Sequence, residues 1–225
     1  MIKATQGRGE GAATRLLSKF TDSRFKQNVT ACTVPRGVYH YFTAATKAKA
    51  YEEVDYFCKT IEPFSDCFSL WAALDVESKY LKGLGKTELT AIVRIALDRI
   101  KLRGFVPMLY TNPNFLTYRF EPHAFDDIDI WLAHYNVAKP MQVPNLKIWQ
   151  HSAGRVCGIS TDVDLDTGYF DGTPYSVGEK YTIRFGDLYS NGFPIPARLI
   201  GKTCTISKVK PDRILLREIL SWVKI

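Results

Sequence analysis

The chain has 225 residues, of which 46% are hydrophobic and 24% are charged, with a formal net charge of +7. This composition supports a packed core and argues against intrinsic disorder. No apolar run reaches the roughly 18 residues of a membrane span, and no apolar core follows the charged N-terminal residues as in a signal peptide. We therefore expect a protein made in the cytoplasm without a signal peptide or a membrane span.

The charge and the cysteines restrict the class of protein further. Residues 179–225 hold nine Lys and Arg against four Asp and Glu, a net of +5, and the first 178 residues carry the other +2. A basic C-terminal segment favours an anionic partner. The five cysteines are odd in number and none has C-x-x-C spacing, so we expect small buried thiols and neither a disulfide framework nor a zinc site.

Short apolar segments alternate with helical patterns along the first two thirds of the chain. Strands are predicted at residues 1–5, 37–42, 68–77, 105–111, 127–135, 146–152 and 161–165. Helices are predicted at residues 46–61 and 86–104, with apolar stripes at Ala50, Val54, Phe57, Cys58 and Ile61 and at Leu89, Ile92, Val93, Ala96, Leu97 and Ile100. Gly104 stands where the residue after a helix C-cap belongs. The alternation predicts an α/β protein with a parallel sheet, and the number of strands favours a barrel.

The composition changes near residue 172, where "DGTPYSVGEK" is typical of a linker. Beyond it, short alternating stretches separated by "SNG" and "KPD" predict a small all-β module. We expect two domains, residues 1–173 and residues 179–225.

Polar and aromatic residues gather where the predicted strands end, and in an α/β barrel the C-terminal strand ends line the active site. They include Tyr39, His40, Asp75, Glu77, Tyr110, Trp131, Tyr135, Gln150, His151 and the acids Asp162, Asp164 and Asp166. Aromatic faces and carboxylates together suit a sugar, whose rings stack on aromatic side chains.

Asp75 and Glu77 are the most informative of these residues. Strand residues two apart point to the same side, so both carboxyls should face one space while Leu74 and Val76 face the helices. Two close carboxylates in a partly dry site cannot easily both ionise, and the one that stays protonated can act as a general acid. The alternative is a solvated strand-end pair, or a salt bridge to Lys79 or Lys82.

Eight segments in family order make residues 1 to about 173 resemble the family 25 glycoside hydrolases, the Chalaropsis-type lysozymes of phage endolysins and bacterial autolysins. They are "IKATQG", "DSRFKQN", "GVYHYF", "LDVES", "PMLYT", "DIWLAHY", "IWQHS" and "VDLD". The resemblance implies a barrel of five β/α units followed by three plain strands. It also implies hydrolysis of the β-1,4 bond between N-acetylmuramic acid and N-acetylglucosamine in peptidoglycan, without a metal or cofactor.

The resemblance also implies roles for individual residues. Glu77 would protonate the leaving oxygen, and Asp75 would stabilise positive charge or orient the acetamido group of the substrate. Asp164 matches a third acid. Tyr110, Trp131 and Gln150 match substrate-binding positions, and Tyr39, His40 and Tyr135 are further substrate-binding candidates.

The C-terminal segment resembles the small Src-homology-three-like modules that bind cell walls, on "GDLYSNG", "RLIGKTCTI" and "ILLREILSWVKI". A basic module of this kind would suit anionic wall polymers. The alternative is a stabilising cap that binds nothing.

The sequence departs from the family in two places. The usual first strand, which supplies another acid, is absent, and Gln6 stands where the family often has an acid. We therefore expect an open barrel with unpaired edges beside residues 2–5 and 162–165, and a chain that is a weak or inactive muramidase.

Two other functions remain open at this point. One is a peptidoglycan-binding protein that binds glycan without hydrolysing it. The absent strand favours this alternative, and the intact "LDVES" argues against it. The other is nucleic-acid binding, which the basic tail raises. No recognised module or Arg-rich run supports nucleic-acid binding, so we expect no nucleic-acid partner. The expected site of action is the bacterial cell wall.

Overall fold

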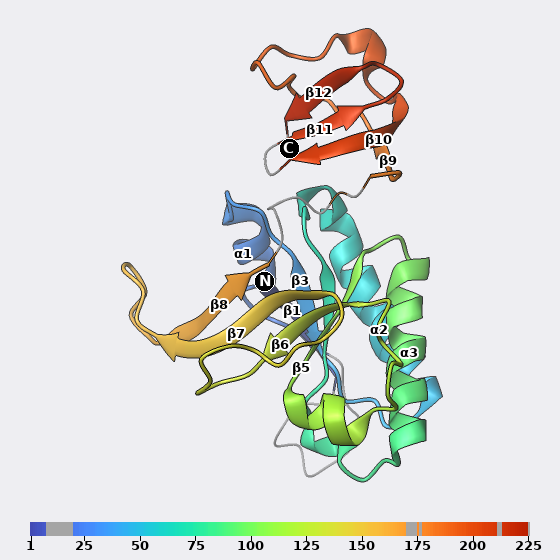
Figure 1. Ribbon diagram of the computed structural model, residues 1–225, viewed down its shortest axis with the longest axis vertical. Coiled ribbons are helices and arrows are strands. Elements are labelled where there is room, and N and C mark those ends of the chain that lie inside the picture. Colours follow the sequence, from blue (N-terminus) through green and yellow to red (C-terminus); the bar gives the residue numbers. More distant parts are fainter. Residues whose placement is uncertain (8–19, 170–174, 176, 211–212, 225) are drawn as a thin grey trace. The chain divides into compact units, whose positions relative to one another are not determined.

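The computed structural model describes residues 1–7, 20–169, 175, 177–210 and 213–224. The chain divides into two compact units, Met1–Tyr169 and Phe170–Ile225, which Figure 1 draws from blue to orange and from orange to red. Half of the predicted linker "DGTPYSVGEK", residues 171–174 and 176, lies outside the described residues, as do residues 211–212 of the predicted "KPD" turn.

The first unit is built on an eight-stranded mixed sheet in the order β2-β1-β3-β4-β5-β6-β7-β8. Strands β1 and β3 to β7 run parallel, while β2 and β8 pair antiparallel with their neighbours. The strands are β1 (Ile2–Gln6), β2 (Phe20–Thr21), β3 (Val38–Tyr41), β4 (Ala72–Asp75), β5 (Pro107–Thr111), β6 (Asp129–Ala133), β7 (Leu146–Gly154) and β8 (Val163–Gly168).

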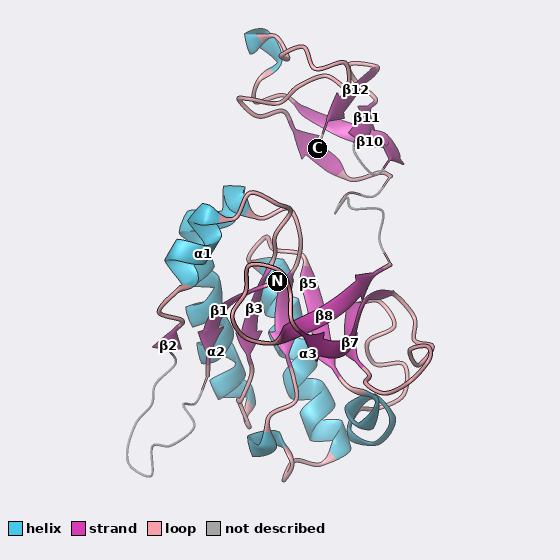
Figure 2. Ribbon diagram, turned by 90° about the vertical axis from the view of Figure 1, so that its left-hand side faces the viewer, coloured by secondary structure: helices cyan, strands magenta, loops and turns pink. Residues whose placement is uncertain are grey.

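In the described part of the first unit, three α-helices accompany this sheet. Figures 1 and 2 show α2 and α3 running along one of its faces. They are α1 (Phe25–Ala31), α2 (Lys47–Ile61) and α3 (Lys86–Leu102). The apolar stripes predicted for α2 and α3 are the residues that these helices bury. None of the helices in the described part of the chain is long and apolar enough to cross a membrane.

The ends of the helices follow their sequence signals. The Thr46 hydroxyl caps the start of α2 by accepting the Lys49 N–H. Gly104 follows the C-cap Arg103 of α3 with φ +87°, and its N–H donates to the carbonyl of Lys101 at 3.0 Å. This left-handed conformation is open to glycine without a Cβ penalty, which is why the helix stops there.

Strand β4 is shorter than its apolar sequence predicted. Only Ala72–Asp75 pair as a strand, and a 3-10 turn covers Glu62–Cys67. The N–H of Phe68 donates to Ser65 and that of Leu70 to Arg36, so the backbone turns before it reaches the sheet. The apolar character of residues 68–71 predicts that they are buried, but it does not distinguish a strand from a packed turn.

The edges of the sheet differ in part from the expectation. The outer edge of β1 was predicted to be unpaired, but β2 pairs with it at Thr5 and Gln6. Phe20–Thr21 carry no strand signal in the sequence, because two residues are too few to show a period. In the described part of the chain, β8 pairs only with β7, so the sheet is a curled half-barrel there.

The second unit contains a four-stranded antiparallel sheet in the order β12-β11-β10-β9. Its strands are β9 (Lys180–Thr182), β10 (Thr203–Lys210), β11 (Arg213–Leu216) and β12 (Ser221–Lys224). A small separate core of Tyr181, Ile183, Ile195, Cys204, Ile206, Ile214, Leu216 and Val223 holds it together. The all-β character of this segment was predicted correctly, since its alternation and turn residues are local signals.

All five cysteines are free. The prediction of buried thiols is correct for Cys58 and Cys204 and wrong for Cys157, which is exposed beyond the end of β7. The apolar neighbours of Cys157 suggested burial, but residues 155–162, between β7 and β8, are all exposed.

Candidate active site

The strand register brings polar and aromatic side chains into one row across the sheet. Gln6 is paired with Tyr41, Tyr41 with Asp75, Asp75 with Tyr110, and Tyr110 with Trp131. The intervening residues of these strands belong to the core that packs against the helices, for example Leu74, Leu109 and Ile130. Since alternate strand residues point to opposite sides, the row lies on the face away from α2 and α3, which we call the polar face.

Asp75 lies deepest among the acids of the polar face. Its side chain is 7% exposed, and its Oδ1 atom is buried without a hydrogen-bond partner among the described residues. Burial, and then the neighbouring Glu77 carboxylate, raise the pKa of Asp75 well above its ordinary value, while the positive charge of Lys3 opposes them. This carboxyl is therefore held in a protonated form over a wider pH range than a free aspartate.

Glu77 lies at the rim, beyond the end of β4. Val76 is completely buried and donates its N–H to the Tyr110 carbonyl at 2.9 Å, so the strand alternation continues and Glu77 points to the same side as Asp75. The Glu77 residue is exposed, yet the protein around its carboxyl raises its pKa by burial, and the Asp164 carboxylate adds to this. Neither Asp75 nor Glu77 forms an ion pair with a described Lys or Arg.

Asp164 lies on β8 and acts on the site through its charge. It raises the pKa of Glu77, and it contributes to the raised pKa values of Tyr39 and Tyr135, each about 12, for which burial is the largest cause. The three predicted acids therefore belong to one electrostatic neighbourhood, although they come from strands 85 or more residues apart in the sequence.

Two tyrosine hydroxyls hold the side-chain amide of Gln150, on β7, through hydrogen bonds. The Tyr110 hydroxyl donates to Gln150 Oε1 at 2.8 Å, and the Tyr135 hydroxyl donates to the same oxygen. Because Gln150 is only 3% exposed and its oxygen is already used, its NH₂ group is the part left to donate to a ligand.

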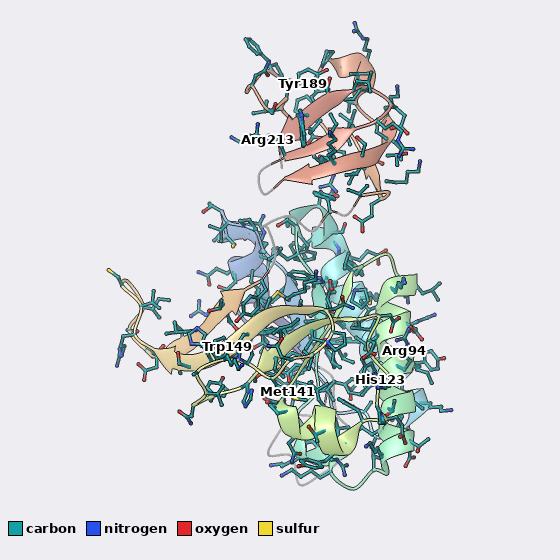
Figure 3. All side chains as sticks on the ribbon, in the orientation of Figure 1. Arg94, His123, Met141, Trp149, Tyr189 and Arg213 are labelled. Atoms are coloured by element: carbon teal, nitrogen blue, oxygen red, sulfur yellow. The ribbon has the colours of Figure 1, made fainter. Side chains whose placement is uncertain are left out.

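Two hydrogen bonds to His134 hold the loop after β6, which carries Tyr135, in place. The Trp149 indole, labelled on β7 in Figure 3, donates to the His134 carbonyl at 2.8 Å, and the Met141 N–H donates to His134 Nδ1 at 3.1 Å. Tyr135 itself is 40% exposed. The residue next to the anchored His134 is thus held at the edge of the polar face.

Trp131 is the central aromatic of the polar face. Its ring meets Tyr110 edge to face at a centroid distance of 4.7 Å and Tyr39 at 6.2 Å. Its indole Nε1 donates to Asp166 Oδ1 at 2.7 Å. Such a fixed ring can support the apolar face of a sugar.

His40 does not belong to this face, and its prediction as a substrate-binding residue is wrong. It is fully buried on the helix side, where Nδ1 lies 2.7 Å from the Thr5 hydroxyl and Nε2 lies 3.1 Å from Glu53 on α2. Neighbouring residues of a strand point to opposite sides, so Tyr39 and His40 could not both face a ligand.

Sequence reasoning assigned no role to Asp166 or Lys3 of the polar face. Asp166 was named among the acids at the strand ends but was not chosen as a site residue, although it stands two residues after Asp164 and therefore on the same side of β8. Lys3 had no signal in the sequence, because a bulge in β1 decides where it points. In the described part of the chain, no group of three or more His, Cys, Asp or Glu side chains is placed to hold a metal ion.

Comparison with known proteins gives relatives that cover most of the first unit. The family model for glycosyl hydrolases family 25 matches residues 1–159. An autolytic lysozyme from Clostridium acetobutylicum is 30% identical over 170 residues, which are 73% of this chain and 47% of that protein, so the chain spans about half the length of this relative.

Two solved structures have a similar fold. The CTP1L endolysin matches with a TM-score of 0.59 and 25% identity over 74% of this chain and 56% of that one. The spore cortex lytic enzyme SleM of Clostridium perfringens matches with a TM-score of 0.68 and 20% identity over 99% of this chain and 77% of that one. Because the family model covers more than half of the sequence, the chain belongs to the glycosyl hydrolases of family 25.

Proposed function

We propose that this chain is a peptidoglycan muramidase, which hydrolyses the β-1,4 bond between N-acetylmuramic acid and N-acetylglucosamine. The observation that carries the proposal is the pair Asp75 and Glu77, two acids with raised pKa values on a face lined by aromatic rings. Membership of the family supports the reaction class. A related autolytic lysozyme and a related endolysin support the wall as substrate.

Glu77 is the proposed general acid. It lies at the exposed rim, where a bound glycan can reach it, and its raised pKa keeps the proton that the leaving oxygen needs. Asp164 reinforces this by its negative charge.

Asp75 is proposed to act on the sugar ring rather than on the leaving group. Its buried Oδ1 lacks a partner in the described chain, so it is available to stabilise the positive charge that develops at the anomeric carbon or to orient the acetamido group. The remaining side chains are proposed to bind substrate. Tyr39, Tyr110 and Tyr135 would do so through their rings and hydroxyls, Trp131 through its ring, and Gln150 through its NH₂ group.

The test is release of reducing ends from purified peptidoglycan by the wild type, by Glu77→Gln and by Glu88→Gln. Glu88 is a matched control because it is an exposed glutamate on α3, on the helix side of the sheet. We expect activity from the wild type and Glu88→Gln, and a loss of about 10²–10⁴-fold in Glu77→Gln. Equal activity of the two variants would refute the assignment of Glu77.

A second candidate function is glycan binding without cleavage. It is supported by β8, which has no second strand beside it in the described part of the chain. In this case wild type and Glu77→Gln would both sediment with insoluble peptidoglycan, and neither would release reducing ends.

The second unit is proposed to add affinity for anionic wall polymers. Its net charge of +5 over residues 179–225 supports this, and the register places Arg213, labelled in Figure 3, beside Lys224 on the neighbouring strand. Lys208→Gln combined with Lys224→Gln should weaken sedimentation with walls that carry anionic polymers. It should have little effect on walls stripped of them, and salt should reduce the difference.

A further inference from the structure

The side chain of Lys3 lies among the acids of the polar face, and a β-bulge places it there. The register of β1 pairs Lys3 with Tyr39 and Thr5 with His40, which leaves Ala4 as an extra residue. Residues three apart in a regular strand point to opposite sides, but the extra residue turns Lys3 and Gln6 to the same side. The Lys3 ammonium accordingly donates to Gln6 Oε1 at 2.9 Å. Bulges of this kind often re-aim a side chain beside an active site.

The ammonium of Lys3 lies close to the row of residues that contains Asp75. Its Nζ lies 5.9 Å from the centroid of the Tyr41 ring, and Tyr41 is the register partner of Asp75. Lys3 forms no ion pair within 4 Å with a carboxylate in the described ranges. It therefore acts on Asp75 as a nearby charge rather than through a contact, and Gln6 keeps it in place.

The other groups that face Asp75 are acidic or neutral. Glu77 follows on the same segment, Tyr39 and Tyr41 come from β3, and Tyr110 comes from β5. Raised pKa values keep the Tyr39 and Tyr110 hydroxyls neutral. Among the described residues, Lys3 is thus the one positive charge found to act on Asp75.

We propose that Lys3 is a positioning residue of the site, whose charge lets the buried Asp75 ionise when positive charge develops in the substrate. The physical reason is that Asp75 Oδ1 has no hydrogen-bond donor in the described structure. An isolated carboxylate in a dry site is unstable unless an opposite charge compensates it. The proposal rests on the muramidase function proposed above.

The experiment compares Lys3→Met with Lys3→Arg, which keeps the charge, and with Lys49→Met, which removes an exposed lysine on α2. The first readout is the pH profile of kcat on peptidoglycan. Lys3→Met should move the rising limb of the profile to higher pH and leave KM nearly unchanged. On that limb kcat should fall by about tenfold, which is less than the 10²–10⁴-fold loss expected when an acid–base group is removed. Lys3→Arg should restore the limb, and Lys49→Met should leave it in place.

The second readout needs no activity. Carboxyl-carbon NMR should show Asp75 titrating at higher pH in Lys3→Met than in the wild type, with Asp75→Asn identifying the signal. If the wild type releases no reducing ends, this titration still tests Lys3 separately from the muramidase proposal. Lys3→Gln replaces Lys3→Met if the latter does not fold. An unmoved titration, or a rise in KM with an unmoved pH profile, would overturn the proposal.

Discussion

Replacing Asp75 by Asn should stabilise the protein at neutral pH while it removes activity. The wild type buries a carboxyl whose Oδ1 has no partner in the described structure, and its pKa is raised well above 3.8. A buried polar group without a partner costs about 1–3 kcal/mol, and more when it is charged. The amide of Asn keeps the cost of the neutral group, so the substitution removes only the additional cost of the charge. The Asn amide has nearly the same volume and no charge, so the folded state no longer has to hold a proton or bury a carboxylate.

The pH dependence follows from the sign of the shift. A carboxyl whose folded pKa lies above its unfolded value contributes stability below the unfolded pKa, and this contribution is lost as the pH rises through the folded pKa. Near pH 4 the wild type and Asp75→Asn should therefore unfold at similar temperatures. As the pH rises, the advantage of Asn should grow and then level off at about 2 kcal/mol, which is a rise in Tm of about 4–8 °C for a unit of this size.

The assay is thermal unfolding followed by circular dichroism or calorimetry between pH 4 and pH 8, together with release of reducing ends. Activity should fall by about 10²–10⁴-fold. Asp129→Asn is the matched control, because the Asp129 carboxylate accepts the Trp71 indole N–H at 2.6 Å and Asn should bring it no gain. A lower Tm for Asp75→Asn at pH 7–8, or a gain that does not change with pH, would refute the reasoning.

Three further predictions test a hydrogen bond in the site, a buried carboxylate and the end of α3. Asp166→Asn keeps an acceptor for the Trp131 indole and should retain most activity. Asp166→Leu should raise KM more than it lowers kcat and should shift the tryptophan fluorescence; equal kinetics for the two variants would contradict the hydrogen bond. Glu53→Leu removes the buried carboxylate that interacts with His40 Nε2 and accepts the Thr43 N–H. It should lower the free energy of unfolding by about 1–3 kcal/mol, measured by urea denaturation, whereas an unchanged midpoint would contradict it. Gly104→Ala has open space for its Cβ but a φ of +87°, so it should cost about 1 kcal/mol by the same measurement, and a gain in stability would show that the backbone there relaxes.

Several features of this protein depend on local patterns and can be predicted from the amino-acid sequence. The stripes of α2 and α3, the stop at Gly104 and the alternation of β4 around Asp75 and Glu77 are set by residues a few positions apart, and the structure confirms them. The same alternation rule, applied to Tyr39 and His40, would have separated the ring on the polar face from the buried imidazole.

Other features depend on contacts between distant segments and are seen only in the folded chain. The pairing of β2 with β1 and the hydrogen bonds from Trp131 to Asp166 and from Tyr110 to Gln150 join residues 14 to 40 positions apart, which no local period encodes. The bulge at Ala4 reverses the side to which Lys3 would otherwise point relative to Gln6. Burial around Asp75 arises only when strands β1, β3, β4 and β5 lie side by side, and it is this burial that changes an ordinary aspartate into a group with a raised pKa.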